Sequence, residues 1–433
     1  MIELGALSRR CRPAVRWLAV VALTMSAWIG TAAPVAAAPV DGRVLPADSR
    51  FYVQPDSLAA LQALTDLRDG HLQDALTMAK LASYPESSWF GSGTPTEVQT
   101  GVERVERAAA RQRAVPILVA YNIPGRDCSL YSGGGAASDA AYRDWIAGFA
   151  RGIGAARTVV VLEPDALANL PSDCGQDPDG TVTPGRLADL NYAVQVLEAQ
   201  PRTLVYLDAG NSSWQAVGTI AERLVAAGVA QAQGFSLDVS NFHATSETNE
   251  YGGWVSRCIW FATRGPAWGA GHFNYCASQY FSSSAPNDGK PGNKVVGSDP
   301  TTWHWTDLWY QQNTAAAPQE LLSHFVADTS RNGQGSWKPS VSPGPGDAQT
   351  WCNPPDRGVG LRPTADTGVP QLDAYLWVKT IGASDGTCTR GLPAGSPDPV
   401  YGAVDPVAGA WWPAQALTLA RNANPTLTFA WQH

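Results

Sequence analysis

Two acidic residues at the end of an apolar run are the first candidates for chemistry in this chain. Residues 159–170 read VVVLEPDALANL, and the apolar part ends at Glu163 and Asp165, on either side of Pro164. Proline lacks a backbone N–H and disfavours a helical residue before it, so we expect a strand that stops here. Carboxyl groups at a strand end that faces a cleft are suited to acid catalysis on an uncharged polymer.

Five further apolar runs end in polar side chains. They are residues 116–122, 203–210, 234–241, 324–332 and 374–386. Between the runs, apolar residues recur at helical spacing, as in the stripe Tyr142, Trp145, Ile146 and Phe149. Alternating strands and helices predict an α/β fold with a covered parallel sheet, and polar strand ends favour a parallel (β/α) barrel with its active site at the C-terminal ends of the strands. A doubly wound sheet is the alternative, but no glycine-rich phosphate fingerprint follows a strand.

The chain has the organisation expected of one exported domain. Residues 1–38 combine a basic start, a short apolar stretch and Ala36-Ala37-Ala38, which predicts a signal peptide. The pair Arg9-Arg10 leaves open whether export follows the general or the twin-arginine route. We expect residues 39–433 to form a single catalytic domain. Residues 242–319, rich in Gly, Ser, Asn, Trp and Tyr, are expected to be a long loop insertion, and residues 391–407 a second, shorter one.

The charge balance limits the possible partners. Removal of residues 1–38 takes away four arginines and Glu3, so the formal net charge changes from −8 to −11. An acidic surface argues against nucleic acid and anionic membranes as partners. No later stretch resembles a membrane span. We therefore expect a secreted monomer that acts on an uncharged substrate.

Cysteines and histidines bear on redox state and metals. Six cysteines remain after the signal peptide, an even number that predicts three disulfides, although six cysteines allow fifteen pairings. The six histidines form no HxH or HExxH motif. We therefore expect no metal and no cofactor, and isolated histidines such as His243 are given no role.

Tryptophan is abundant, with 17 residues. Most are expected to pack in the core. Tryptophan faces also stack on the apolar faces of sugar rings. The candidates for sugar contact lie near polar strand ends and are Trp89, Trp214, Trp351 and Trp377.

Six motifs in a fixed order resemble one family of enzymes. They read AYNIPGRDC, VVVLEPDALANL, YLDAG, DTSRNG, WCNPPDRGVGLRP and LWVKTIGASDGTC. Together they resemble glycoside hydrolase family 6, over about residues 51–431. The resemblance implies a distorted (β/α) barrel with fewer than eight strands. It also implies hydrolysis of β-1,4-glucosidic bonds in cellulose or a related β-glucan, with inversion at the anomeric carbon.

The resemblance also implies roles for particular residues. Asp165 is the expected general acid, and Asp127 matches the carboxylate that raises its pKa. Asp385 matches the expected base, although a water chain can relay the proton instead. An inverting pair of carboxyls is spaced roughly 6.5–9.5 Å apart, which leaves room for the attacking water. The expected substrate-binding residues are Tyr121, Ser132, Trp89, Asp208, Trp214, Asn241, Trp351 and Lys379.

Some of these acids have structural alternatives. We expect Glu163 to be a buried structural partner rather than a catalyst. Asp208 and Asp328 could instead form ion pairs inside the barrel mouth, for example with Arg331.

The resemblance further implies disulfides and one departure from the family pattern. Cys128–Cys174 and Cys352–Cys388 match two family disulfides, which leaves Cys258 to pair with Cys276. The family often has a histidine after YLDAG, where this chain has Asn211. A sugar contact is therefore expected to differ at that position.

Three alternatives to an endo-acting inverting enzyme remain. The loop at residues 128–138 is short, which favours an open groove and cleavage within the polymer. The insertions at residues 242–319 and 391–407 could instead cover the cleft, as an exo-acting cellobiohydrolase requires. The others are a catalytically silent glucan-binding protein, disfavoured by the retention of all three aspartates, and a retaining glycosidase.

Overall fold

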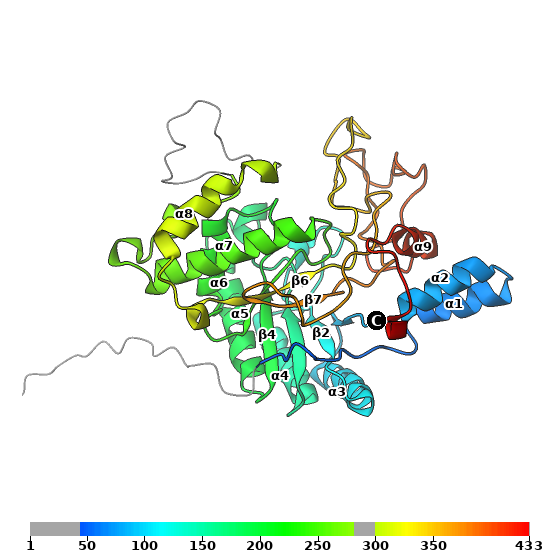
Figure 1. Cartoon of the computed structure of the whole chain (residues 1–433), viewed down its shortest axis with the longest axis horizontal. Coiled ribbons are helices and arrows are strands. Elements are labelled where there is room, and N and C mark those ends of the chain that lie inside the picture. Colours follow the sequence, from blue (N-terminus) through cyan, green and yellow to red (C-terminus); the bar gives the residue numbers. More distant parts are fainter. Residues whose placement is uncertain (1–43, 281–298, 433) are drawn as a thin grey trace, which may run out of the picture. The chain divides into compact units, whose positions relative to one another are not determined.

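Seven parallel strands form the framework of the protein. The computed structural model describes residues 44–280 and 299–432, and Figure 1 shows their arrangement. Each strand pairs in parallel with the next strand of the chain, so the order in space is the order in sequence. The strands are β1 (Ser88–Phe90), β2 (Ile117–Ala120), β3 (Thr158–Leu162), β4 (Thr203–Asp208), β5 (Gly234–Leu237), β6 (His324–Asp328) and β7 (Leu372–Leu376).

The first and last strands meet, but they do not form a regular ladder within the described residues. Just before β1, the Ser87 N–H donates to the Trp377 carbonyl at 3.0 Å, and the Ser87 hydroxyl donates to the Val378 carbonyl at 2.5 Å. The Trp89 indole N–H donates to the same Val378 carbonyl at 2.8 Å. Isolated bonds therefore close the sheet, which confirms the expected distorted barrel with fewer than eight strands.

Helices follow most strands and cover the outside of the sheet. The apolar side chains of most of these helices pack on the outward-facing side chains of the strands, whereas those of the first two helices and the last one pack together in a separate cluster. The α-helices of the described residues are α1 (Leu58–Arg68), α2 (Leu72–Ala82), α3 (Pro95–Gln112), α4 (Asp139–Ile153), α5 (Val182–Glu198), α6 (Val217–Ala226), α7 (Thr245–Arg264), α8 (His304–Thr314) and α9 (Pro413–Arg421).

Alternate residues of each strand face two different cores. In β3, Val160 and Leu162 pack in the large core under the helices, whereas Val159 and Val161 pack inside the barrel. Because all four are fully buried, the strand is apolar on both faces, as its continuous apolar sequence predicts. In β3 the first acidic side chains, Glu163 and Asp165, come directly after the strand end.

Helix α4 shows how local sequence and packing agree. The Ser138 hydroxyl caps its N-terminus by accepting the Ala141 N–H at 3.2 Å. The predicted stripe of Tyr142, Trp145, Ile146 and Phe149 is buried against the sheet.

Two features of the fold differ from the sequence interpretation. Residues 242–319 are not simply loop, because they include the 20-residue helix α7 and the 11-residue helix α8. The six expected strands are β2 to β7, and β1 was not predicted, since its three residues form no long apolar run. The expected signal peptide, residues 1–38, lies outside the described residues.

All three expected disulfides are present. Cys128–Cys174, Cys258–Cys276 and Cys352–Cys388 have S–S distances of 2.03–2.07 Å. The second joins α7 to the turn that precedes the undescribed residues 281–298.

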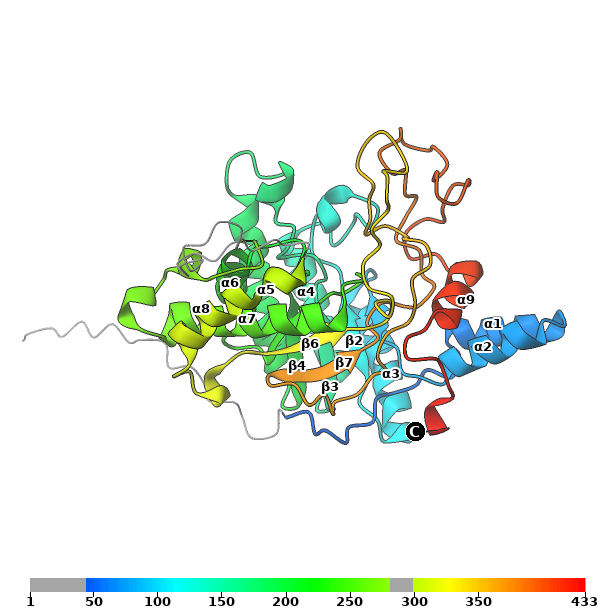
Figure 2. The same ribbon diagram turned by 45° about the horizontal axis from the view of Figure 1, so that its top comes forward.

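The loops that follow the strands gather on one side of the sheet. In Figure 2 the yellow and orange loops after β6 and β7 rise on the same side as the cyan turn after β2. Over residues 44–280 and 299–432, no helix has the length and apolar character needed to cross a membrane.

Adjacent glycines of α7 provide a matched test of this packing. A Cβ at Gly252 would lie 2.5 Å from the Phe325 ring, whereas a Cβ at Gly253 would meet nothing within 4 Å. Phe325 is fully buried and stacks on Phe235, so it has little room to move.

We therefore expect Gly252→Ala to lower the free energy of unfolding by about 1–3 kcal/mol through overpacking. Gly253→Ala should raise it by about 0.5–1 kcal/mol, because alanine favours the helix. Urea unfolding followed by circular dichroism measures both. Equal effects of the two substitutions would contradict this account of the α7 interface.

Candidate active site

A cavity of about 730 Å³ opens at the C-terminal ends of the strands. It brings together residues that are far apart in the sequence, from the ends of β2, β3, β4, β5 and β7 and from the loops that follow them. The predicted residues that line it are Trp89, Tyr121, Asp127, Ser132, Asp165, Trp214, Asn241, Trp351, Lys379 and Asp385.

Asp165 lies just beyond β3 and has a strained backbone. Its φ of 68° is in the left-handed region, which an L-residue seldom adopts and which is enriched at functional sites. Its backbone N–H donates to Asp208 Oδ1 at 2.9 Å. Burial raises the pKa of Asp165 well above its usual range, and the nearby charges of Asp208 and Asp127 raise it further. These surroundings favour the protonated form of Asp165.

Asp208 lies beneath the cleft rather than in its wall. The carboxylate is buried and also accepts the Gly210 N–H at 3.1 Å and the Ser236 hydroxyl at 3.1 Å. Burial raises the pKa of Asp208 to about 7. The expectation of a substrate contact by Asp208 is not supported by this position, since its oxygens are taken up by protein donors next to Asp165. The alternative of an ion pair with Arg331 is not observed either.

Asp127 lies in a short turn that follows β2. Its Oδ2 accepts the Ser132 N–H at 2.8 Å, and burial raises the pKa of Asp127 above its ordinary value. Arg126 ties the same turn to its surroundings by donating to the carbonyls of Ser132, Gly91 and Tyr121 at 2.5–2.9 Å. The turn thus presents Asp127 to the same cavity as Asp165.

Asp385 is held in the opposite protonation state. Lys379 Nζ lies 3.1 Å from Asp385 Oδ1, and Arg331 Nη1 lies 3.0 Å from Oδ2. The backbone N–H of Asn353 donates to Oδ2 at 2.9 Å. Although burial acts to raise the pKa of Asp385, the charges of Arg331 and Lys379 outweigh it, and the pKa is lowered. There is therefore a pH range, between the lowered pKa of Asp385 and the raised pKa of Asp165, in which Asp385 is a carboxylate while Asp165 is still protonated.

Two other acidic side chains accept hydrogen bonds from backbone N–H groups. Glu163 is fully buried and accepts the N–H groups of Asn122 and Ile123 at 2.9–3.0 Å, in agreement with its expected structural role. The suggested pairing of Asp328 with Arg331 is wrong, because Arg331 binds Asp385. Asp328 instead accepts backbone N–H groups from three segments, at Ser240, Ser330, Val378 and Lys379.

Aromatic side chains form much of the cavity wall. Tyr121 packs edge-on against Trp89 at 5.4 Å between ring centroids. Trp214 and Trp351 are 36% and 41% exposed, so both present a face to solvent within the cavity. The expectation that Trp377 could contact sugar is wrong. Its side chain is fully buried and packs on Tyr84.

Several residues in the wall were not predicted. His243 was given no role, yet it lines the cavity, where its Nδ1 lies 3.1 Å from the Ser336 hydroxyl and 3.5 Å from Glu247. Only the fold brings the chain segments of these residues together, and no local motif marks them. Asn211, the departure from the family pattern, also lines the cavity. Other unpredicted residues in the wall include Leu130, Tyr131, Asn169, Phe242, Trp337 and Lys338.

One group of potential metal ligands occurs in the described part of the chain. It consists of Cys388, Asp398 and Asp405. Cys388 is bonded to Cys352, so its sulfur is not a thiolate and the group does not fit a metal ion that needs three ligands.

Comparisons with known proteins agree with this geometry. A family model described as glycosyl hydrolases family 6 matches residues 46–423. The chain is 35% identical over 347 residues to endoglucanase 1 of Streptomyces halstedii, covering 79% of this chain and 83% of that protein. It is 30% identical over 347 residues to a probable 1,4-beta-D-glucan cellobiohydrolase C of Aspergillus fumigatus, covering 75% of this chain and 65% of that protein.

A solved structure shares both fold and sequence. The endoglucanase Cel6 from Mycobacterium tuberculosis, in complex with a methyl-cellobiosyl-thio-cellobioside, superposes with a TM-score of 0.62 at 32% identity. The match covers 87% of this chain and 98% of that one. With a family model that spans most of its length and a distorted barrel that carries the six motifs at one mouth, this chain belongs to glycosyl hydrolase family 6.

Proposed function

We propose that the protein hydrolyses β-1,4-glucosidic bonds of cellulose or a related β-glucan with inversion, and that it cleaves within the polymer. The observation that carries this proposal is that two carboxyl groups line one cavity in surroundings that shift their pKa values in opposite directions. Asp165 is kept protonated by burial and by its acidic neighbours, whereas Asp385 is kept ionised by Arg331 and Lys379. Inverting hydrolysis requires such a pair.

In the proposed reaction, Asp165 donates its proton to the oxygen of the leaving sugar. Asp127, beside it, helps to keep that proton in place before the reaction. A water on the opposite face of the sugar attacks the anomeric carbon and loses a proton toward Asp385, directly or through a second water. Because its two cationic partners make Asp385 a weak base, we expect its negative charge also to stabilise the positive charge that develops on the sugar.

The aromatic and polar residues of the wall would hold the chain of sugars. We propose that Trp89, Trp214 and Trp351 stack on sugar rings, and that Tyr121 lies under the ring at the cleavage point. Burial and the nearby charges of Asp165 and Asp127 raise the pKa of Tyr121, so it remains a neutral phenol. Ser132, Asn241 and Lys379 are proposed to bind sugar hydroxyls.

Endo action is supported by the exposure of the cavity wall. Trp214 and Trp351 remain 36% and 41% exposed, which fits a groove open to solvent better than a covered tunnel. Three disulfides and the expected signal peptide support a secreted enzyme, because disulfides persist in oxidising compartments. We propose a single catalytic domain over residues 39–433.

The proposal is tested by Asp165→Asn in a viscosity assay on carboxymethyl cellulose. The wild type should lower the viscosity rapidly, as cleavage within the polymer does. Asp165→Asn should reduce the rate by about 10²–10⁴-fold, because it removes the general acid. Its affinity for cello-oligosaccharides, measured by calorimetry, should remain.

The exposed Asp366→Asn serves as the control for loss of one acidic charge and should behave as the wild type. Release of cellobiose without a fall in viscosity would contradict endo action and support exo action instead. Binding without any sugar release by the wild type would instead support the catalytically silent glucan-binding protein. Proton NMR of the first anomer formed distinguishes inversion from retention.

The pH dependence of kcat/KM tests the role of Asp208. Its negative charge raises the pKa of Asp165, so Asp208→Asn should lower that pKa. Asparagine Oδ1 can still accept the Asp165 N–H, so the turn should be preserved. The alkaline limb of the pH profile should move to lower pH by about one unit. If the alkaline limb is the same in Asp208→Asn as in the reference variant Asp366→Asn, Asp208 does not determine the pKa of Asp165.

A further inference from the structure

Asn353 and Asp385 form a reciprocal pair of hydrogen bonds. The backbone N–H of Asn353 donates to Asp385 Oδ2 at 2.9 Å, and the backbone N–H of Asp385 donates to Asn353 Oδ1 at 2.8 Å. The disulfide Cys352–Cys388 joins the same two segments of the chain. Because the backbone of each residue is bonded to the side chain of the other, neither side chain can turn without breaking a hydrogen bond.

The amide of Asn353 is also fixed in its orientation. Its Oδ1 accepts Gln415 Nε2 at 3.1 Å in addition to the Asp385 N–H. Its Nδ2 lies 2.9–3.0 Å from three acceptors, which are the Ser384 hydroxyl oxygen, the Gly386 carbonyl and Asp405 Oδ2. If the amide were turned round, donors would face donors and acceptors would face acceptors. The side chain of Asn353 therefore has one arrangement that satisfies its neighbours.

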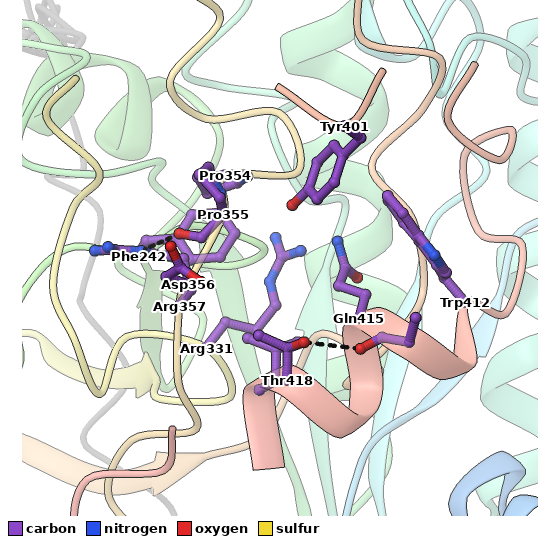
Figure 3. Close-up of a pocket in the computed structure, with 12 residues that line it drawn as sticks. Phe242, Arg331, Pro354, Pro355, Asp356, Arg357, Tyr401, Trp412, Gln415 and Thr418 are labelled. Atoms are coloured by element: carbon purple, nitrogen blue, oxygen red, sulfur yellow. Dashed lines mark hydrogen bonds between the residues drawn. The ribbon is translucent and has the colours of Figure 1, made fainter. Parts of the chain in front are cut away.

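Further side chains hold the backbone of Asn353. The residue is fully buried, and its φ of 41° lies in the left-handed region, which asparagine adopts more readily than most residues. Its carbonyl accepts the Tyr401 hydroxyl at 3.0 Å. Figure 3 shows the polar ends of Tyr401, Gln415 and Arg331 directed toward one region beside α9. Each of these side chains bonds to Asn353 or to Asp385, so together they keep the pair in place.

The pair determines which oxygen of Asp385 is available in the catalytic cavity. Oδ2 accepts from the Asn353 N–H and from Arg331 Nη1 at 3.0 Å, so both of its lone pairs are occupied. Within the described residues, Oδ1 has one donor, Lys379 Nζ at 3.1 Å. Asp385 and Lys379 both line the cavity. Oδ1 is therefore the oxygen that can accept a further hydrogen bond from a water there.

We propose that Asn353 is a positioning residue for the base of the reaction. It holds Asp385 so that Oδ2 is bound by the protein, while Oδ1 is presented to the attacking water or to a water that relays its proton. This inference rests on the proposed inverting hydrolysis. Because Asn353 is fully buried, it acts through Asp385 and does not contact the sugar.

Asn353→Gly tests the effect on turnover. Glycine accepts a positive φ, so the substitution removes the side-chain hydrogen bonds without adding backbone strain. With cellotetraose, kcat should fall by about 10–100-fold, because a small displacement of a catalytic group has a large effect on rate. KM should change by less than about twofold, since the lost interaction does not involve the bound sugar.

Ser256→Ala is the matched control for the loss of a buried hydrogen bond. The Ser256 hydroxyl on α7 donates to the Ser323 carbonyl at 2.7 Å, and neither residue lines the cavity. This variant should keep the kcat and KM of the wild type. A folded Asn353→Gly enzyme with the kcat of Ser256→Ala would overturn the proposal.

Gln415→Ala provides a second variant that does not change Asn353 itself. It removes one donor from Asn353 Oδ1 and should lower kcat by about two- to fivefold. Because Gln415 acts through Asn353, the double variant should have the kcat of Asn353→Gly alone. A double variant whose loss equals the product of the two single losses would contradict the proposal. If Asn353→Gly does not fold, a wild-type kcat in Gln415→Ala would contradict it.

The pKa of Asp385 provides a measurement that needs no hydrolysis. The charged and titratable groups near this carboxyl are Arg331, Lys379 and Asp165. Burial acts to raise the pKa of Asp385, whereas Arg331, Lys379 and the Asn353 N–H lower it. In Asn353→Gly the donors should hold Oδ2 less closely, so the pKa should rise.

Carbon-13 NMR of the carboxyl measures this rise, and the acid limb of the kcat profile should move to higher pH with it. An unchanged pKa of Asp385 in a folded Asn353→Gly protein would overturn the inference. A wild type that cleaves no glucan would refute the proposed function, whereas a raised pKa in Asn353→Gly would still show that Asn353 positions Asp385.

Discussion

The site depends on a carboxyl group that is placed where its charge is disfavoured. Asp165 lies at the end of β3, and the buried carboxyl of Asp208 accepts its backbone N–H from below. Two carboxyl groups this close in a site with little water do not both ionise readily. The protein donors on Asp208 stabilise its negative charge, so the proton is favoured on Asp165. The raised pKa of Asp165 is thus a consequence of where β3 and β4 end.

The barrel mouth tolerates an unfavourable backbone to achieve this placement. Asp127, Asp165 and Asp238 all have left-handed φ values of 54–68°, a conformation that costs about 1–3 kcal/mol for such residues. Asp328 accepts backbone N–H groups from the segments after β5, β6 and β7. A single buried carboxylate therefore holds three loop starts together beneath the cavity.

Much of this was predictable because it is local. Continuous apolar runs predicted β2 to β7. The resemblance to the family, rather than local sequence, implied two of the disulfides, left the third by elimination, and implied that Asp127, Asp165 and Asp385 share one cavity. What depends on three-dimensional contacts was not predictable. The pairing of Arg331 with Asp385 and the position of His243 in the cavity wall depend on how the loops pack. Loop packing has no periodic sequence pattern from which it could be predicted. Helix α7 was missed because its polar and glycine residues resemble a loop, although packing on the sheet stabilises it.

The protonation state of Asp165 is the central claim, and carbon-13 NMR of aspartate carboxyls measures it directly. The signal of Asp165 is assigned by its absence in Asp165→Asn, and it is followed from pH 3 to pH 9. The account predicts that this carboxyl remains protonated at neutral pH. Titration near the ordinary aspartate pKa of about 3.9 would contradict it.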